Sequence, residues 1–308
     1  MEKMLKEIKN SHKFYLKRIK IATNLLILSG TLWGISYFFI DKNIWYILFI
    51  LLCFVGCIFL MIENFYKSKF IGIYKDKFIK FALNEIGLNY EPKGGFKKDD
   101  FDKIDIYKSS KMTNEDEISG IYKGLNFKIS DLKSKSKSLY RFYMSNNIIG
   151  NIINTYSLVA NYFNFSGIVL SCEINLDLKE PVFVLDNSFN TKSKIGHIKF
   201  NDVVFDNAFK FYFKNELKTR EFLSPNLINS LLKTRNKLNY SVKVSYVFSG
   251  ENLFIFLKDK QEIFSDLEFE HAYEISNLEI SKKCFKKYQD EILELLSLFD
   301  EFINLMKF

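Results

Sequence analysis

The chain has 308 residues, a formal net charge of +8 and a sequence pI near 9.0. A basic chain of this size suggests nucleic-acid binding, but the charge is confined to two short segments, which leaves a neutral remainder and excludes that reading. Four cysteines without a C-x-x-C pair and three scattered histidines give no metal-ligand spacing, so no metal site is predicted.

Two uncharged apolar runs lie near the N-terminus, at residues 21–40 and 44–62, with only three residues between them. At about 1.5 Å of helix per residue, each run spans the roughly 30 Å hydrocarbon core of a bilayer. A cleaved signal peptide has a shorter apolar region, and a soluble core helix usually keeps a polar stripe. We therefore predict a transmembrane hairpin over residues 21–62, after a basic cytosolic segment, residues 1–20.

The flanking charges predict the orientation of this hairpin. Residues 1–20 contain seven Lys or Arg against Glu2 and Glu7, a balance of +5, and residues 63–80 contain five Lys against Glu63 and Asp76, a balance of +3. The positive-inside rule then places both termini in the cytoplasm. We expect a multi-pass protein of the bacterial cytoplasmic (inner) membrane, with the lipid bilayer as a partner and no nucleic acid.

Small residues in both runs allow close helix packing. Gly30 and Gly34 form a G-x-x-x-G pair, and Cys53, Gly56 and Cys57 supply small side chains in the second run. The other arm of the same hairpin is the simplest partner, and a homodimer is the alternative.

An amphipathic pattern follows the second run. Phe70, Tyr74, Phe78, Phe81 and Ala82 recur at steps of mostly three or four residues, with lysines between them. This predicts a membrane-proximal helix over residues 63–87, lying on the membrane surface or rising from it as a stalk.

Residues 88–308 are predicted to form one cytosolic α+β domain with mainly antiparallel strands. Lys123-Gly124 marks a β-hairpin, Ser224-Pro225 begins a helix, and residues 249–252 read as the turn of a second hairpin. Residues 139–162 read as an Asn-rich insertion, and a long helix is expected from about Ile280 to Phe308. Further strands are predicted at residues 163–175 and 182–186, and a helical end followed by a strand at residues 206–213.

Three stretches carry a resemblance to a known family: Asn114–Gly120 (NEDEISG), Asn164–Val169 (NFSGIV) and Asp206–Leu232, with its Leu-x-Pro before a helix. The chain resembles the bacterial membrane-anchored domain-of-unknown-function family DUF3137. The resemblance implies two N-terminal membrane spans and a cytosolic α+β domain, supplies no chemistry, and implies a membrane protein of the LemA type as a partner. The motif positions that it marks are Asp116, Gly120, Gly167, Asp206, Phe209 and Pro225.

The sequence feature most similar to a catalytic cluster is the acidic trio Glu115, Asp116 and Glu117. A solvent-exposed turn is the simpler interpretation of this trio. Gly120 is expected to meet a backbone requirement, and Asp206 to cap a helix or form a turn. No phosphate-binding loop, nucleophile elbow or dinucleotide fingerprint is present. No catalytic, cofactor-binding or metal-binding residue is predicted.

These observations favour a membrane-tethered cytosolic interaction or scaffolding module over an enzyme. The alternative is a membrane-bound enzyme with an unrecognised site, acting on a lipid or an envelope precursor.

Overall fold

The computed structural model describes residues 2–36, 42–97, 111–135, 165–187, 196–198, 202–213, 222–239, 241–258, 260 and 278–303. The chain forms two compact units, Met1–Ala82 with Phe264–Tyr288 and Leu83–Ile263 with Gln289–Phe308. Part of the C-terminal segment thus groups with the N-terminal helices. The predicted insertion at residues 139–162 lies outside the described residues.

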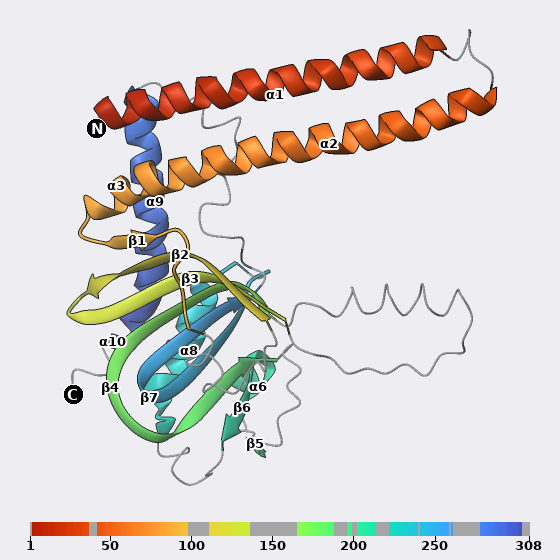
Figure 1. The fold of residues 1–308 in the computed structure, drawn as a ribbon. Helices are drawn as coiled ribbons and strands as arrows, with labels where there is room; N and C mark the ends of the chain where they lie inside the picture. Colours follow the sequence, from red (N-terminus) through yellow and green to blue (C-terminus); the bar gives the residue numbers. More distant parts are fainter. Residues whose placement is uncertain are drawn as a thin grey trace, which may run out of the picture. The chain divides into compact units, whose positions relative to one another are not determined.

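The first unit contains a long helical hairpin (Figure 1). Helix α1 spans Glu2–Ser36 and α2 spans Lys42–Tyr74, followed by a π-helix, η1, at Lys75–Ile79 and by α3 at Lys80–Asn84. At 1.5 Å per residue, α1 and α2 are each about 50 Å long. Helical structure therefore runs well beyond the apolar segments, and the helix predicted over residues 63–87 continues α2 without a break.

Helices α1 and α2 pack against each other in antiparallel order. Trp33 contacts Phe49 near one end, with ring centroids 5.1 Å apart, and Tyr15 contacts Tyr66 further along, at 5.8 Å. The side chains of α1 that are buried or half-buried in this seam recur at alternating steps of four and three, the heptad spacing of packed helices. They are Ile8, His12, Tyr15, Ile19, Ala22, Leu26, Ser29 and Trp33.

The G-x-x-x-G pair does not lie in this seam. A Cβ placed on Gly30 or Gly34 would have no heavy atom within 4 Å, whereas one on Gly56 would lie 3.6 Å from Leu26 Cδ1. The expectation that Gly30 and Gly34 pack against the other arm of the hairpin is therefore wrong, because the heptad seam passes beside them.

An aromatic stack joins the π-helix to α9, which spans Leu278–Leu296. Within the first unit, Phe78 stacks face to face on Phe285, at 4.3 Å and 9°, and Tyr74 stacks on Phe78 at 4.7 Å. Burial raises the pKa of the Tyr74 hydroxyl. Helix α9 contributes to both units, because the division of the chain falls between Tyr288 and Gln289.

The second unit is built on a seven-stranded sheet in which every pairing is antiparallel. The path is β1-β2-β3-β4-β6-β5, and β7 pairs with β4. This arrangement confirms the predicted mixed fold with antiparallel strands, and β2 and β3 form the predicted hairpin around Lys123-Gly124. The strands are β1 Asn89–Glu91, β2 Lys111–Tyr122, β3 Leu125–Lys135, β4 Phe165–Asp186, β5 Gly196–Ile198, β6 Phe209–Phe213 and β7 Lys243–Lys258.

Two predicted breaks are absent from the central strands: the turn at residues 249–252 and the gap between the predicted strands 163–175 and 182–186, which β4 joins into one strand. The turn expected at residues 249–252 is wrong, because β7 continues through it and pairs with β4 on both sides. Gly250 takes a positive φ of 59° opposite Leu178, where the register shifts. A glycine at a register shift bends a strand without ending it, so β4 and β7 run on as long bent strands.

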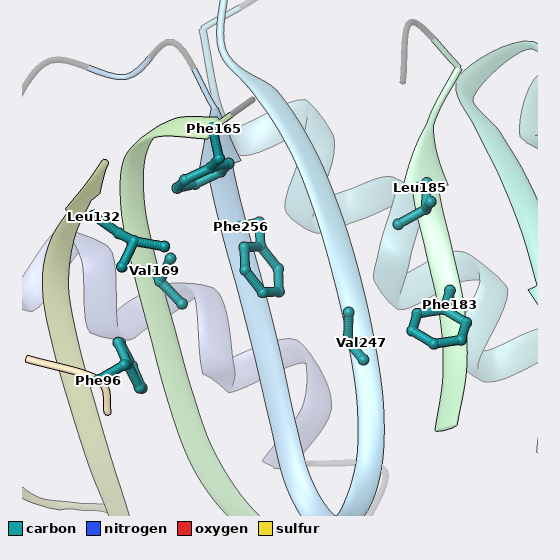
Figure 2. Close-up of a cluster of buried hydrophobic side chains, with 8 residues drawn as sticks. All are labelled: Phe96, Leu132, Phe165, Val169, Phe183, Leu185, Val247 and Phe256. Carbon is teal, nitrogen blue, oxygen red and sulfur yellow. The ribbon is translucent and has the colours of Figure 1, made fainter. Parts of the chain in front are cut away.

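Apolar side chains fill both faces of this sheet. Figure 2 shows one cluster, in which Phe96 joins side chains from β3, β4 and β7. On the opposite face Tyr246 contacts Phe302 of α10, Asp300–Ile303, at 5.6 Å. Val247 belongs to the cluster in Figure 2 and its neighbour Tyr246 does not, as expected for alternating side chains. The cluster comprises Phe96, Leu132, Phe165, Val169, Phe183, Leu185, Val247 and Phe256.

Three short elements complete the described part of this unit: α6 at Val203–Ala208, α8 at Pro225–Lys237 and the 3-10 helix η3 at Ser297–Phe299. Ser224 caps α8, since its Oγ accepts a hydrogen bond from the Leu227 N–H at 3.3 Å, and Pro225 occupies the first turn. The predicted start of this helix is confirmed.

Candidate functional site

A band of exposed apolar side chains surrounds both long helices. Met61 is 72% exposed and Ile50 is 68% exposed. Apolar side chains that are exposed together to this extent are typical of a surface that contacts a membrane or another protein. Elsewhere among the described residues, the exposed large apolar side chains are Phe14, Ile121, Val203, Val204 and Leu293. The band comprises Ile21, Leu25, Ile27, Leu28, Leu32 and Ile35 on α1, and Tyr46, Ile47, Phe49, Ile50, Leu51, Phe54, Ile58, Leu60, Met61, Ile62 and Phe65 on α2.

By length and composition, one helix within the described ranges could cross a membrane, Phe49–Asn84. The first run, residues 21–40, does not pass this test in its described part, and its last four residues lie outside that part. The prediction of two spans therefore stays a prediction.

A stripe of lysines runs along the outer face of α1. Lys3, Lys6, Lys9, Lys13, Lys17 and Lys20 are all exposed and follow one another at steps of three or four residues. We call these six residues the lysine stripe. The acidic Glu7 lies off the stripe and pairs with Lys77 of η1, which lowers the pKa of the Glu7 carboxyl through their hydrogen bond. Arg18 donates to the Tyr66 hydroxyl at 3.5 Å.

Asp116 is the most unusual polar residue of the sheet. It is 1% exposed, adopts a positive φ of 59°, and lies where the pairing of β2 with β3 shifts register. Its Oδ1 accepts a hydrogen bond from the Tyr90 hydroxyl of β1, and its N–H donates to the Pro92 carbonyl at 3.1 Å. Burial, and then the nearby Asp116 carboxylate, raise the pKa of Tyr90. Asp116 therefore fastens the edge strand β1 to β2.

The acidic trio does not converge on one point. Glu115 is exposed, whereas Glu117 pairs with Lys128 at 3.1 Å. The Ser130 hydroxyl donates to the Glu115 carbonyl at 3.0 Å, and the Asn114 amide donates to the Phe96 carbonyl at 2.6 Å. The predicted solvated turn is wrong for Asp116, which is buried in β2, and these hydrogen bonds and the ion pair connect strands and loops.

Close backbone packing requires Gly167, whereas Gly120 lies against the end of a neighbouring side chain. A Cβ on Gly120 would lie 2.9 Å from Leu88 Cδ2, and φ at this residue is not positive, so the constraint is steric. A Cβ on Gly167 would lie 2.0 Å from the Leu257 carbonyl oxygen of β7. Both glycines thus allow neighbouring segments to approach the sheet.

A second polar cluster lies between α8 and the end of β4. Asp186 is 5% exposed and lies 3.7 Å from the Arg235 guanidinium, while its N–H donates to the Ser245 hydroxyl at 3.0 Å. The same guanidinium lies over the Phe209 ring, 5.3 Å from its centroid. Phe209 is 2% exposed and packs on Phe205. Phe209 thus supports a nearly buried ion pair, and Arg235 remains half-exposed.

Asp206 does not have the predicted capping role. The cap of α6 is Asp202, whose Oδ1 accepts from the Val204 and Phe205 N–H groups at 2.9 and 3.0 Å. Asp206 lies inside the helix, and its N–H donates to the Asp202 carbonyl at 2.8 Å. The capping prediction was therefore four residues late.

Among the described residues, no three His, Cys, Asp or Glu side chains are grouped so that they could hold a metal ion. Cys172 is buried in β4, and burial raises the pKa of its thiol to about 12. A thiol of that kind is a poor nucleophile near neutral pH.

The comparisons with known proteins identify a family over part of the chain. Residues 163–305 match the model of DUF3137, described as a protein of unknown function. This part of the chain is DUF3137-like. The match begins after Asn114–Gly120 and includes the whole of the other two resembling stretches, so it contains Gly167, Asp206, Phe209 and Pro225 but not Asp116 or Gly120.

No curated protein matches the chain. One solved structure, the crystal structure of the mycobacterial trehalose monomycolate transport factor A, is similar at 8% identity over 69% of this chain and 93% of that chain. Its TM-score is 0.35, a likeness too low to bear on fold or function here.

Sequence reasoning missed Tyr90, Asp186 and Arg235. The two residues of the DUF3137-like part, Asp186 and Arg235, are far apart in sequence and meet through the pairing of strands with α8. Asp186 at the end of an apolar strand was a usable signal, because a carboxylate that follows a buried run needs a partner. Tyr90 lies in a three-residue strand, where no periodicity could reveal its bond to Asp116.

Proposed function

We propose that the protein is a membrane-tethered interaction or scaffolding module, anchored in the bacterial inner membrane by α1 and α2. The observation that carries this proposal is the band of exposed apolar side chains on both helices, which charged residues flank at Lys20 of α1 and at Glu63 and Lys67 of α2. In water such a band would be strongly unfavourable. In a bilayer, each Leu, Ile or Phe near the middle of a span contributes about −0.3 to −0.6 kcal/mol.

Both helices continue past the band on its basic side. The nineteen residues of α1 before Ile21, Glu2–Lys20, extend about 28 Å at 1.5 Å per residue. Contacts of Tyr15 with Tyr66 and of Glu7 with Lys77 hold this part of the hairpin together. We infer that the hairpin spans the bilayer and projects into the cytoplasm as a two-helix stalk, with both termini on that side.

The interaction role is favoured over the enzyme because bonds in the two buried polar clusters join elements of the fold. Tyr90 bonds Asp116, and Arg235 pairs with Asp186. Turnover of a lipid or envelope precursor by the purified protein would favour the enzyme instead.

Topology reporters test the anchor. A reporter that is active only outside the cytoplasmic membrane should signal when it is inserted at Lys42 and be silent when it is fused before Met1 or after Phe308. If α2 alone crossed the membrane, the N-terminal and Lys42 fusions would behave alike, and the two-span proposal would fail. A signal from the Phe308 fusion would reverse the orientation.

A further inference from the structure

The lysine stripe occupies the face of α1 that α2 does not cover. At about 100° per residue, its six members fall within a sector of about 120°, a third of the helix circumference. Ile8 and Ile19, which are buried in the seam with α2, project from the opposite side of the helix. The only acidic residue between Lys3 and Lys20 is Glu7, and it is paired with Lys77. The hairpin itself therefore does not neutralise this face.

A helix face that carries charges of only one sign destabilises the helix. Like charges at steps of three or four residues destabilise a helix by a few tenths of a kilocalorie per mole for each pair, and ordinary solvated helices mix the two signs. The stripe holds five consecutive pairs of this kind. Such a face favours an anionic partner.

Lipid headgroups reach only one end of the stripe. This step rests on the proposed membrane anchor, which places Lys20 at the bilayer surface. Lys3 then lies about 26 Å further along the continuous helix, whereas electrostatic attraction in the cytoplasm is screened over about 8 Å. Anionic lipids can attract Lys17 and Lys20, but Lys3, Lys6 and Lys9 need another partner.

Charge and spacing narrow the choice of that partner. A second copy would place like charges opposite one another. Sites for nucleic acids favour arginine and stacked aromatic rings, but the stripe contains lysine alone, and Arg18 lies off it beside Tyr66. Steps of three and four residues match the rungs of a second helix, where acidic side chains recur at the same intervals.

We propose that the lysine stripe docks an acidic helix of a partner protein. The same side of α1 continues into the apolar band, where Asn24, Thr31 and Gly34 lie among larger apolar side chains, and nothing lies within 4 Å of a Cβ placed on Gly34. Small residues let membrane helices approach closely, and an amide can bond across them. The continuous surface therefore fits a partner helix that extends from the cytoplasm into the bilayer.

The test uses the full chain in nanodiscs of neutral phosphatidylcholine and three soluble probes. The first is a helical peptide with glutamates at steps of three and four on one face, the second has the same composition with glutamates spread around the helix, and the third is a DNA duplex of similar charge. We expect the first peptide to bind best. Lys6→Glu with Lys13→Glu should weaken its binding by about tenfold or more, because attraction becomes repulsion.

A matched variant, Lys69→Glu with Lys80→Glu, makes the same change in net charge off the stripe and should leave binding within about twofold. Lys6→Gln with Lys13→Gln should weaken binding less than the glutamate pair does. Equal binding of the two peptides, tighter binding of DNA, or equal losses in both glutamate variants would overturn the proposal. Extraction of membranes with carbonate separates the two hypotheses: a chain that is extracted refutes the anchor, whereas a retained chain without peptide preference refutes the lysine stripe alone.

Discussion

Asp116 shows how one backbone conformation changes the role of a charged residue. An aspartate in a strand normally alternates to one face, but the positive φ of 59° and the register shift turn this carboxylate inward. Aspartate tolerates the left-handed conformation better than most residues, because its short side chain can bond locally. The buried carboxylate then needs donors, and Tyr90 supplies one.

Loss of the Tyr90 hydroxyl should therefore be costly. Tyr90→Phe should lower the free energy of unfolding by about 1–3 kcal/mol, since it leaves a buried charged acceptor without one donor. Tyr246→Phe is a matched comparison, because that hydroxyl donates to the neutral Leu231 carbonyl at 3.2 Å. Denaturant titration of the solubilised full chain should show the larger loss for Tyr90→Phe. The reverse order would mean that the Asp116 bond does not stabilise the fold.

At the scale of the element, α8 is held by its apolar side and by charged residues. Leu231 is fully buried, and Ser230 and Thr234 are buried beside it, whereas Ile228 and Leu232 are half-buried. The Thr234 hydroxyl donates to the Ser230 carbonyl at 2.8 Å, so this polar side chain can lie in the interior. The buried side is therefore rotated relative to the one that hydrophobic periodicity alone predicts.

Leu231→Ala should destabilise the protein by about 2–5 kcal/mol, because it opens a cavity between α8 and the sheet. Lys233→Ala should change stability little, since its side chain is 68% exposed and its ion pair with Glu301 is long, at 3.9 Å. Thermal denaturation of the two variants measures the difference. Equal melting temperatures would show that Leu231 does not stabilise the packing of α8.

The sequence predicted local elements better than the contacts between distant elements. Short local segments of the sequence specify the hairpin at Lys123-Gly124, the cap at Ser224 and the strand after α6. The continuous β7 was missed because Gly250 in a polar quartet reads as a turn, and only pairing with β4 shows that the strand continues. The ion pair of Asp186 with Arg235 likewise depends on contacts between distant segments.

At the scale of the whole molecule, the reactivity of the cysteines tests the proposed membrane anchor. Cys53 and Cys57 are exposed on α2, Cys284 is half-exposed, and Cys172 is buried. In inverted vesicles, a water-soluble maleimide should label Cys284 and spare Cys53 and Cys57, because the proposed anchor places these two residues in the bilayer. Cys172 should also be spared, since burial raises its pKa to about 12 and excludes the reagent.

Mass spectrometry of the labelled chain would locate the modified thiols. All four should react after denaturation in detergent, which serves as the control. Rapid labelling of Cys53 or Cys57 in intact vesicles would place this part of α2 in water and contradict the membrane anchor.

The π-helix η1 has a consequence for the length of the chain. Phe70, Tyr74 and Phe78 follow one another at steps of four, and an α-helix of 3.6 residues per turn would rotate each successive ring by about 40°. The wider turn at Lys75–Ile79 takes up that rotation, as a helix does when it absorbs an inserted residue. Removing one residue there would turn the residues of α3 that follow Ile79 by about 100° around the helix axis. The direction in which the chain leaves the stalk is thus set by a count of residues.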